Sequence, residues 1–276
     1  MPLFEPSDNK SKYKFFSLGS GSSGNCCYLG NDDHGILIDA GVGIRKVTKT
    51  LREYGVSFDK IRGVLLTHDH ADHIKTAGCL GIKHSLPIYA TEAVHFGLQR
   101  SKFLQGDLYA SKKIIQVENP FSIESFTITA FEVPHDSIQN VGYHIQFDGQ
   151  IFVLITDAGR ITSTIRKYAC EANHLVMEAN YDDEMLINGH YPTYLKQRIT
   201  NGTGHMSNIL SAEFLGSIYH QEMKNIWLCH LSQDNNNPEL AYSTIAEALT
   251  DAGAEIDVNL SLETLNIYKA SGLTEL

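Results

Sequence analysis

Short apolar runs alternate with segments of helical spacing along the chain, and this order predicts a mixed α/β fold. Apolar runs bounded by glycine or polar residues are typical of buried strands, and apolar positions three or four residues apart are typical of helices. In the first part of the chain these patterns predict strands over 13–18, 26–29, 35–41, 63–66 and 87–90, and helices over 44–54 and 72–83.

Beyond residue 110 the pattern first favours strands and then returns to alternation. The dipeptide Asp148-Gly149 separates two apolar runs and is a strong signal for a hairpin. The patterns predict strands over 114–117, 126–131, 141–147, 151–155, 174–179 and 226–229, and helices over 161–169, 182–188, 191–199, 207–221 and 238–250. Since no proline-rich linker or repeat divides the chain, we expect a leader over 1–12 and a single domain of mixed sheets with outer helices over 13–276.

Four side chains that bind metals follow the predicted strand over 63–66, in the run Thr67-His68-Asp69-His70-Ala71-Asp72-His73. In an extended segment His68 and His70 point the same way, while the next carboxylate and imidazole turn toward a second position nearby. Imidazole and carboxylate ligands suit zinc, iron and manganese. The alternative is a solvated loop, which we disfavour because only 13 of the 276 residues are histidine. The spacing therefore predicts two metals.

A site for two metals needs further ligands, and three candidates stand just past the ends of apolar strands. They are His135, Asp157 and His230. Asp39 also follows a strand, where a carboxylate can hold a ligand imidazole by its second ring N–H. An ordinary acid in a turn is the commoner explanation for Asp39.

The segment Ser20-Gly21-Ser22-Ser23-Gly24-Asn25 follows the first predicted strand. Its glycines would let the backbone N–H groups form an anion-binding nest beside the metals. A plain hairpin connection between the strands over 13–18 and 26–29 is equally favoured. Both interpretations stay open at this point.

Composition says more about the partners and the cellular compartment of the protein than about its function. The net charge of −10 argues against a surface that is basic all round, so any contact with nucleic acid must come from a local patch. The five cysteines are scattered and odd in number, which favours reduced thiols in the cytoplasm over a disulfide framework. No apolar run is long enough for a signal peptide or a membrane span, so we expect a cytoplasmic protein without membrane contact.

The order of these motifs resembles the metallo-β-lactamase superfamily over residues 13–268: a His-x-His-x-Asp-His loop, a lone histidine, a Thr-Asp-Ala-Gly segment and a late histidine. Segments 20–25, 204–208 and 230–238 are similar to the YycJ/WalJ (VicX) group within it. The resemblance implies an αββα sandwich of two mixed sheets with helices on both outer faces. It also implies DNA exonuclease activity from 5′ ends, which is associated with that group.

The resemblance further implies two divalent metal ions per chain, which could be zinc, manganese or iron. Seven residues would hold them: His68, His70 and His135 the first ion, Asp72, His73 and His230 the second, and Asp157 both.

Glu178 and His205 are similar to a Glu/His pair of the tRNA 3′-processing ribonucleases in the same superfamily, where the pair assists proton transfer. Without the resemblance, a turn acid and a histidine at a helix N-terminus would be the favoured interpretations. We expect the catalytic residues to be Asp72, Asp157, Glu178 and His205, the substrate contacts to be Ser20, Ser22, Ser23 and Asn25, and the basic candidates for a strand to be Lys112, Lys113, Lys196 and Arg198.

The expected reaction is phosphodiester hydrolysis, in which a hydroxide bridging the two metals attacks phosphorus and DNA is the substrate. One alternative is a small-molecule metallohydrolase that acts on a cyclic phosphodiester, ester, lactone or thioester. Another is a metal-binding regulatory protein without turnover, which a closed ligand shell would favour. The choice of metal, the choice between DNA and RNA, and assembly into a homo-oligomer stay open.

Overall fold

Two β-sheets carry most of the chain that this computed structural model describes, residues 12–104 and 106–276. Within these residues each sheet has seven strands. The first sheet has the order β14 (Thr274–Glu275), β1 (Lys14–Gly19), β2 (Cys26–Gly30), β3 (Gly35–Ile38), β4 (Ile61–Leu65), β5 (Ile88–Ala90), β6 (Lys112–Ile114). The second has the order β13 (Ser261–Thr264), β12 (Asn225–Cys229), β11 (His174–Glu178), β10 (Gln150–Ile155), β9 (Val141–Phe147), β8 (Phe126–Glu132), β7 (Phe121–Ile123).

The two sheets pack face to face through aromatic side chains. Phe15 of β1 lies 4.3 Å from Trp227 of β12 and 5.2 Å from Phe152 of β10, measured between ring centroids. The next residue, Phe16, points to the other face and stacks on Tyr28. Because both faces of β1 are covered, its residues from Phe15 to Gly19 are all buried and the burial does not alternate along the strand.

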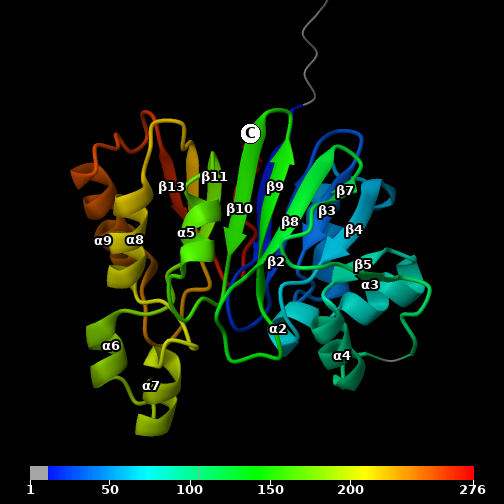
Figure 1. Cartoon of the computed structure of the whole chain (residues 1–276), viewed down its shortest axis with the longest axis horizontal. Helices are drawn as coiled ribbons and strands as arrows, with labels where there is room; N and C mark the ends of the chain where they lie inside the picture. The colour runs from blue at the N-terminus through cyan, green and yellow to red at the C-terminus, as the bar shows by residue number, and fades with distance from the viewer. Residues whose placement is uncertain (1–11, 105) are drawn as a thin grey trace, which may run out of the picture.

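Helices cover the outer faces of both sheets (Figure 1). Side chains of α1 (Ile44–Glu53), α3 (Ala77–His84) and α4 (Glu92–Arg100) join the core on the outer face of the first sheet. Side chains of α5 (Ser163–Ala169), α8 (Asn208–Ile218) and α9 (Pro238–Asp251) do so on the second. Both sheets contain parallel and antiparallel pairs, so the predicted sandwich of two mixed sheets between helices is confirmed.

The hairpin predicted at Asp148-Gly149 is confirmed. It joins the antiparallel strands β9 and β10, and Phe147 pairs with Gln150. The φ angles of Asp148 and Gly149 are 44° and 76°, the left-handed values that a two-residue hairpin turn requires at both central positions.

The prediction of one helix over 72–83 is wrong. The chain forms α2 (Ala71–Ile74) and then α3, with a break between them. In a continuous helix the Thr76 N–H would donate to the Asp72 carbonyl; instead it donates to the Ala40 carbonyl at 2.7 Å, and the Asp72 carbonyl accepts from Asn25 N at 2.8 Å. Contacts with distant segments therefore override the local helical pattern.

Other differences lie at edges and ends of elements. Strand β6 begins two residues before the predicted strand over 114–117, because Lys112 and Lys113 pair with β5 although they are polar. Helix α4 was not predicted, and neither were the strands β7, β13 and β14. Helix α4 follows Thr91, whose hydroxyl caps the helix by accepting from Val94 N at 3.3 Å. The predicted leader over 1–12 lies outside the described residues except for Lys12, so the division into leader and single domain stays a prediction.

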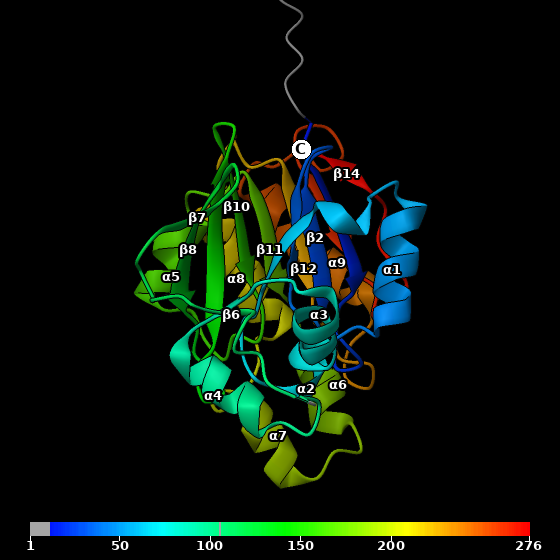
Figure 2. The same cartoon turned by 90° about the vertical axis from the view of Figure 1, so that its right-hand side faces the viewer.

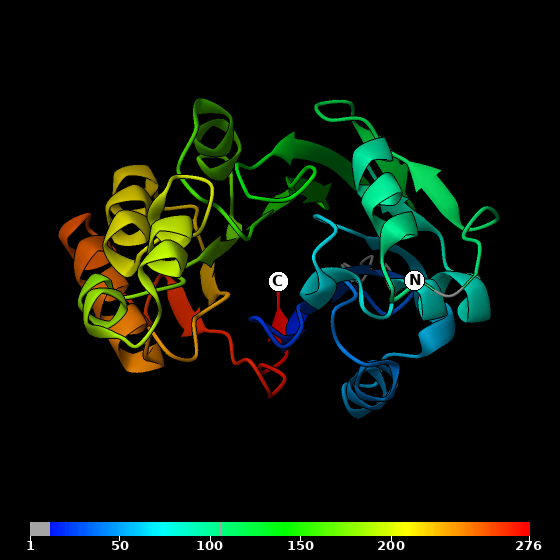
Figure 3. The ribbon, with the colours of Figure 1, turned by 90° about the horizontal axis from the view of Figure 1, so that it is seen from below.

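The carboxyl ends of the parallel strands meet at one edge of the sandwich, beside α2 in Figure 1. Figure 2 shows α4 and α7 (Thr193–Thr200) at the same end, and Figure 3 views this end directly. Loops that leave parallel strands at this edge are brought close together, as at the binding sites of other α/β sheets. In residues 12–104 and 106–276 we find no helix with the length and apolar character of a membrane span.

Candidate metal centre

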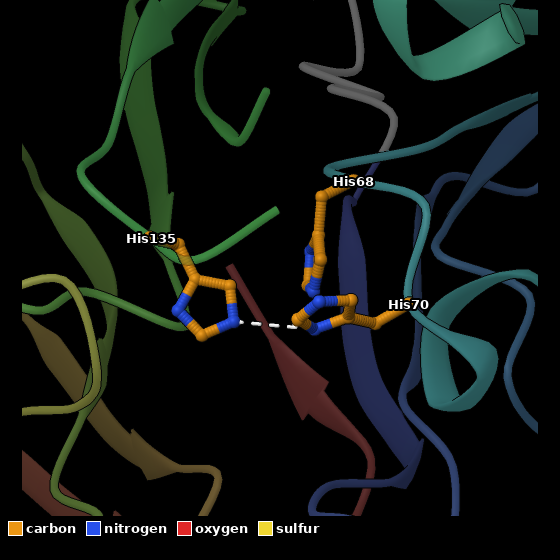
Figure 4. A group of neighbouring side chains, drawn as sticks. All are labelled: His68, His70 and His135. Carbon is orange, nitrogen blue, oxygen red and sulfur yellow. Dashed lines mark hydrogen bonds between the residues drawn. The ribbon is translucent and has the colours of Figure 1, made fainter. Parts of the chain in front are cut away.

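The loop after β4 brings His68 and His70 to the sheet edge, and the loop after β8 brings His135 to face them (Figure 4). One ligand atom from each of the three lies within 4.8 Å of the others. The Nδ1–H of His135 donates to the Gly204 carbonyl at 3.0 Å, so its Nε2 carries the lone pair. That Nε2 lies 3.3 Å from Nδ1 of His70. Ring nitrogens that converge in this way are suited to share one cation.

A second group consists of Asp72 and His73 from α2 and His230 from the loop after β12. His73 is fully buried, and its Nδ1–H donates to Asp39 Oδ2 at 2.7 Å. Asp39 therefore holds a candidate ligand imidazole, which the sequence offered as the less common of its two explanations. His73 Nε2 is left 3.6 Å from Asp72 Oδ2, and His230 Nε2 lies 3.4 Å from the same oxygen.

Asp157 lies between the two groups. Its Oδ1 is 3.7 Å from His135 Nε2 and 3.5 Å from His230 Nε2, and its Oδ2 is 3.2 Å from His73 Nε2. Burial raises the pKa of this carboxyl, but the neighbouring His230 and His73 outweigh burial and hold the pKa well below its ordinary value. A single ionised carboxylate therefore contacts ring nitrogens from both groups.

The donor set fits divalent cations of the zinc, manganese and iron type. Among the described residues, the buried Nε2 of His68 has no hydrogen-bond partner. Burial lowers the pKa of this imidazole well below its ordinary value, so it is neutral and keeps a free lone pair. A buried lone pair without a partner is unfavourable unless a cation meets it. The Asp39 carboxylate and the Gly204 carbonyl accept from His73 and His135 and so fix the orientation of both rings, as hydrogen-bond acceptors commonly do for histidines that bind metals.

Three residues at the site hold left-handed backbone conformations. The φ angles are 63° at Asp39, 53° at Asp157 and 56° at His230, each just past the end of a strand. Aspartate and histidine tolerate this region better than most residues, yet it still carries local strain. The turns direct all three side chains back toward the sheet edge, where the two groups meet.

Glu178 at the end of β11 holds His205. Its Oε1 accepts from His205 Nδ1 at 2.8 Å, and its Oε2 accepts from the N–H groups of Ala158 and Met206 at 2.8 and 3.3 Å. Burial lowers the pKa of His205, but Glu178 outweighs it by charge and hydrogen bond, so the pKa lies above its ordinary value. His230 Nδ1 also lies 3.2 Å from Glu178 Oε1, so one carboxylate contacts both rings.

The loop over 20–25 reaches the site through two buried side chains. Ser20 Oγ accepts from His230 N at 2.9 Å, and Asn25 Nδ2 lies 2.9 Å from His73 Nε2 and 3.3 Å from Asp72 Oδ2. Strands β1 and β2 are antiparallel, so the segment is a hairpin connection. The buried pair contacts candidate ligands, whereas Ser22 and Ser23 are exposed.

Two residues at the site were missed from the sequence. Thr67 Oγ1 lies within 3.2 Å of Asp39, His68 and His73, and Thr67 N donates to Asp39 Oδ1 at 2.8 Å. Asn180 Nδ2 donates to the His230 carbonyl at 2.6 Å. Thr67 directly precedes the histidine motif, which is a usable signal, but nothing local marks Asn180.

Of the basic candidates, only Arg198 lies near the site. Its guanidinium donates to Asp136. Lys196 Nζ donates to the carbonyls of Ile187 and Gly189, and Lys112 and Lys113 belong to the edge strand β6.

Two mixed sheets between helices, with histidines and carboxylates gathered at one sheet edge, define a metallo-β-lactamase-type protein. Residues 34–225 match the family model described as the β-lactamase superfamily domain. The chain is 33% identical to exodeoxyribonuclease WalJ of Streptococcus pneumoniae over 96% of this chain and 98% of that protein. It is 33% identical to exodeoxyribonuclease YycJ of Bacillus anthracis, over 87% and 90% respectively.

Solved structures show the same fold. The metallo-β-lactamase fold protein YhfI from Bacillus subtilis aligns with a TM-score of 0.69 and 20% identity, covering 97% of this chain and all of that one. Zn²⁺-bound PqqB from Methylobacterium extorquens aligns with a TM-score of 0.68 and 17% identity, covering 94% and 99%. The chain belongs to the WalJ/YycJ group of the metallo-β-lactamase superfamily, and this fold implies that it binds divalent metal.

Proposed function

We propose that the protein is a metal-dependent exodeoxyribonuclease that hydrolyses DNA from the 5′ end. The observation that carries the proposal is the position of Asp157, which faces both histidine groups within 3.7 Å, beside a histidine held by a buried glutamate. The relatives named exodeoxyribonuclease support DNA as the substrate. All five cysteines are free thiols, which supports the cytoplasm as the place of action.

Seven side chains would hold two ions of zinc, manganese or iron: His68, His70 and His135 the first, Asp72, His73 and His230 the second, and Asp157 both. When bound, the ions neutralise the charge that develops on the phosphate oxygens and lower the pKa of water toward about 7. Ser20 accepts from His230 N and Asn25 donates to Asp72, so these two residues hold two of the proposed ligands in position.

His205 is the proton donor of the proposed reaction. Glu178 holds Nδ1, so Nε2 remains for the oxygen that leaves phosphorus. The His205 side chain is 19% exposed while Glu178 is fully buried, so the substrate meets the histidine and the carboxylate acts by orienting it. A positioned general acid contributes about 10²–10⁴-fold to the rate.

Replacing Asp157 by alanine tests the proposal. We expect Asp157→Ala to abolish hydrolysis of a p-nitrophenyl phosphodiester and of DNA while circular dichroism shows a retained fold. The matched control is Asp251→Ala, at an exposed position at the end of α9, which should keep full activity. A folded Asp157→Ala protein with full activity would rule out the assignment of Asp157.

A small-molecule metallohydrolase remains the second candidate, because a pocket of only about 250 Å³ adjoins His205. An enzyme that cleaves a panel of esters, lactones or cyclic phosphodiesters faster than DNA would establish it instead.

A further inference from the structure

A pocket of about 250 Å³ is lined by His205 and His230 and by no residue of the first histidine group. Its walls come from α7 and from the loop that follows His230. Leu195, Ile199 and Leu231 give the pocket an apolar part. Ser232 and Gln233 line the same pocket and are polar and uncharged. Apolar side chains together with uncharged hydrogen-bonding groups suit the face and the edge of a nucleobase.

The charges in the pocket do not favour a phosphate. Besides His205 and His230, which border the metal centre, Arg198 is the single cation among the described residues that line it, and its guanidinium is bonded to Asp136. The second carboxylate of the pocket, Asp234, accepts from the Tyr191 hydroxyl at 2.8 Å. Away from the two histidines a phosphate would meet two carboxylates and an arginine that is already paired, so it is better placed at the metal centre than in this pocket.

Helices α6 (Asp183–Asn188) and α7 share a small core of their own. Tyr181, Leu186 and Ile199 form this core, and Tyr191 and Leu195 pack against it. These helices project below the rest of the second sheet's helices in Figure 1. Three of these residues, Tyr191, Leu195 and Ile199, also line the pocket, whose volume lies below the roughly 300–1,000 Å³ of pockets that bury drug-sized ligands.

Resting on the nuclease function proposed above, we propose that this pocket holds the terminal nucleoside whose 3′ oxygen leaves in each hydrolysis step. The base packs against Leu195 and Ile199, and its edge meets Ser232 and Gln233. The 3′ oxygen then lies beside His205, which lines the same pocket.

A water oxygen forms the new bond to phosphorus and gives up one proton to solvent. The P–O3′ bond breaks with its electron pair on O3′, and the proton of His205 Nε2 goes to that oxygen. His205 regains a proton from solvent. The products are one nucleotide with a free 3′ hydroxyl in the pocket and a strand shortened by one unit with a new 5′ phosphate.

Binding of thymidine to the purified full chain tests the pocket without requiring turnover. We expect weak binding with a Kd of about 1 mM, measured by titration calorimetry. Leu195→Trp fills the pocket and should weaken binding by about tenfold or more. The matched control is Tyr194→Trp on the same helix, at a side chain that is 72% exposed and does not line the pocket, and it should bind as the wild type does.

Gln233→Ala is a second test in case Leu195→Trp protein does not fold, because Gln233 lines the pocket and is exposed, so its replacement leaves the core intact. It should weaken thymidine binding severalfold while the circular dichroism stays unchanged. With DNA as substrate, Leu195→Trp should raise KM more than it lowers kcat. Wild-type protein that binds no thymidine at about 20 mM, or Leu195→Trp protein that binds it as well as Tyr194→Trp protein, overturns the pocket assignment.

The same experiment separates this inference from the proposed function. DNA hydrolysis by wild-type protein that binds no thymidine refutes the pocket and leaves the nuclease intact. Thymidine binding that is lost in Leu195→Trp protein, in a protein that hydrolyses no DNA with any metal, supports the pocket and refutes the nuclease.

Discussion

Gly41 lies directly against the backbone of Asp72, and we predict that a single methyl group there displaces the second metal group. A Cβ at Gly41 would lie 1.5 Å from the Asp72 carbonyl oxygen, 2.3 Å from its carbonyl carbon and 2.7 Å from Asn25 N. All three are backbone atoms, so no side chain can rotate away. To reach even 3.0 Å, the Asp72 carbonyl must move by about 1.5 Å.

This movement breaks the hydrogen bond from Asn25 N to the Asp72 carbonyl, now 2.8 Å, and carries Asp72 and His73 with it. Metal–ligand distances tolerate only about 0.2 Å. A misplacement of about 1 Å in a catalytic site can lower the rate about 10²-fold. We therefore expect Gly41→Ala to lose one metal ion per chain, to lose at least that factor in activity, and to lose about 1–3 kcal/mol of stability from overpacking.

The assay is metal content by mass spectrometry after dialysis, together with DNA hydrolysis and urea unfolding. The matched control is Gly43→Ala two residues on, because a Cβ there meets nothing within 4 Å and φ is −60°. The control should behave as the wild type. A folded Gly41→Ala protein with wild-type metal content and activity refutes the reasoning.

Three further predictions concern separate features. Glu178→Gln keeps an acceptor for His205 but removes the charge, so kcat should fall about 10²-fold with little change in metal content; unchanged kcat contradicts the role of Glu178. Burial lowers the pKa of the His174 imidazole to about 4, whereas in the unfolded chain this pKa has its ordinary value of about 6.5. Below pH 6.5 the unfolded chain therefore binds more protons than the folded one, and the free energy of unfolding falls as the pH falls toward 4. In urea unfolding, the free energy of unfolding should fall by about 2 kcal/mol between pH 7 and pH 5. If His174→Gln protein shows the same pH dependence, His174 is not its cause. Away from the two histidines the one cation of the pocket, Arg198, is paired with Asp136, so strands with 5′ hydroxyl ends should be cut at least as fast as 5′ phosphorylated strands. A strong preference for the phosphate contradicts this assignment of the charges.

Much of the fold was predictable because its signals are local. Strands buried on both faces appear as continuous apolar runs, and Asp148-Gly149 dictates its turn through backbone conformation alone. Most candidate ligands were predictable for a related reason, since they follow β4, β10 or β12, and parallel strands bring their ends together. His135 differs, because it follows β8, whose strand pairs are antiparallel.

What could not be predicted depends on distant partners. The break between α2 and α3 arises because Asn25 and Ala40 take the hydrogen bonds that a continuous helix would use. Edge strands such as β13 and β14 form only because a neighbouring strand is already in place. Likewise, the sequence around Ser20 and Asn25 does not reveal that these side chains contact His230 and Asp72.

The central claim is that the two histidine groups and Asp157 form a metal centre that hydrolyses DNA. The most direct test is hydrolysis of 5′-labelled double-stranded DNA with Mn²⁺, Zn²⁺ or EDTA, beside His68→Ala and Asp72→Ala proteins whose metal content is measured. We predict metal-dependent shortening from the 5′ end that EDTA and both substitutions abolish, with one ion lost in each variant. Wild-type protein that binds two metal ions and leaves the DNA intact with every metal would contradict the account.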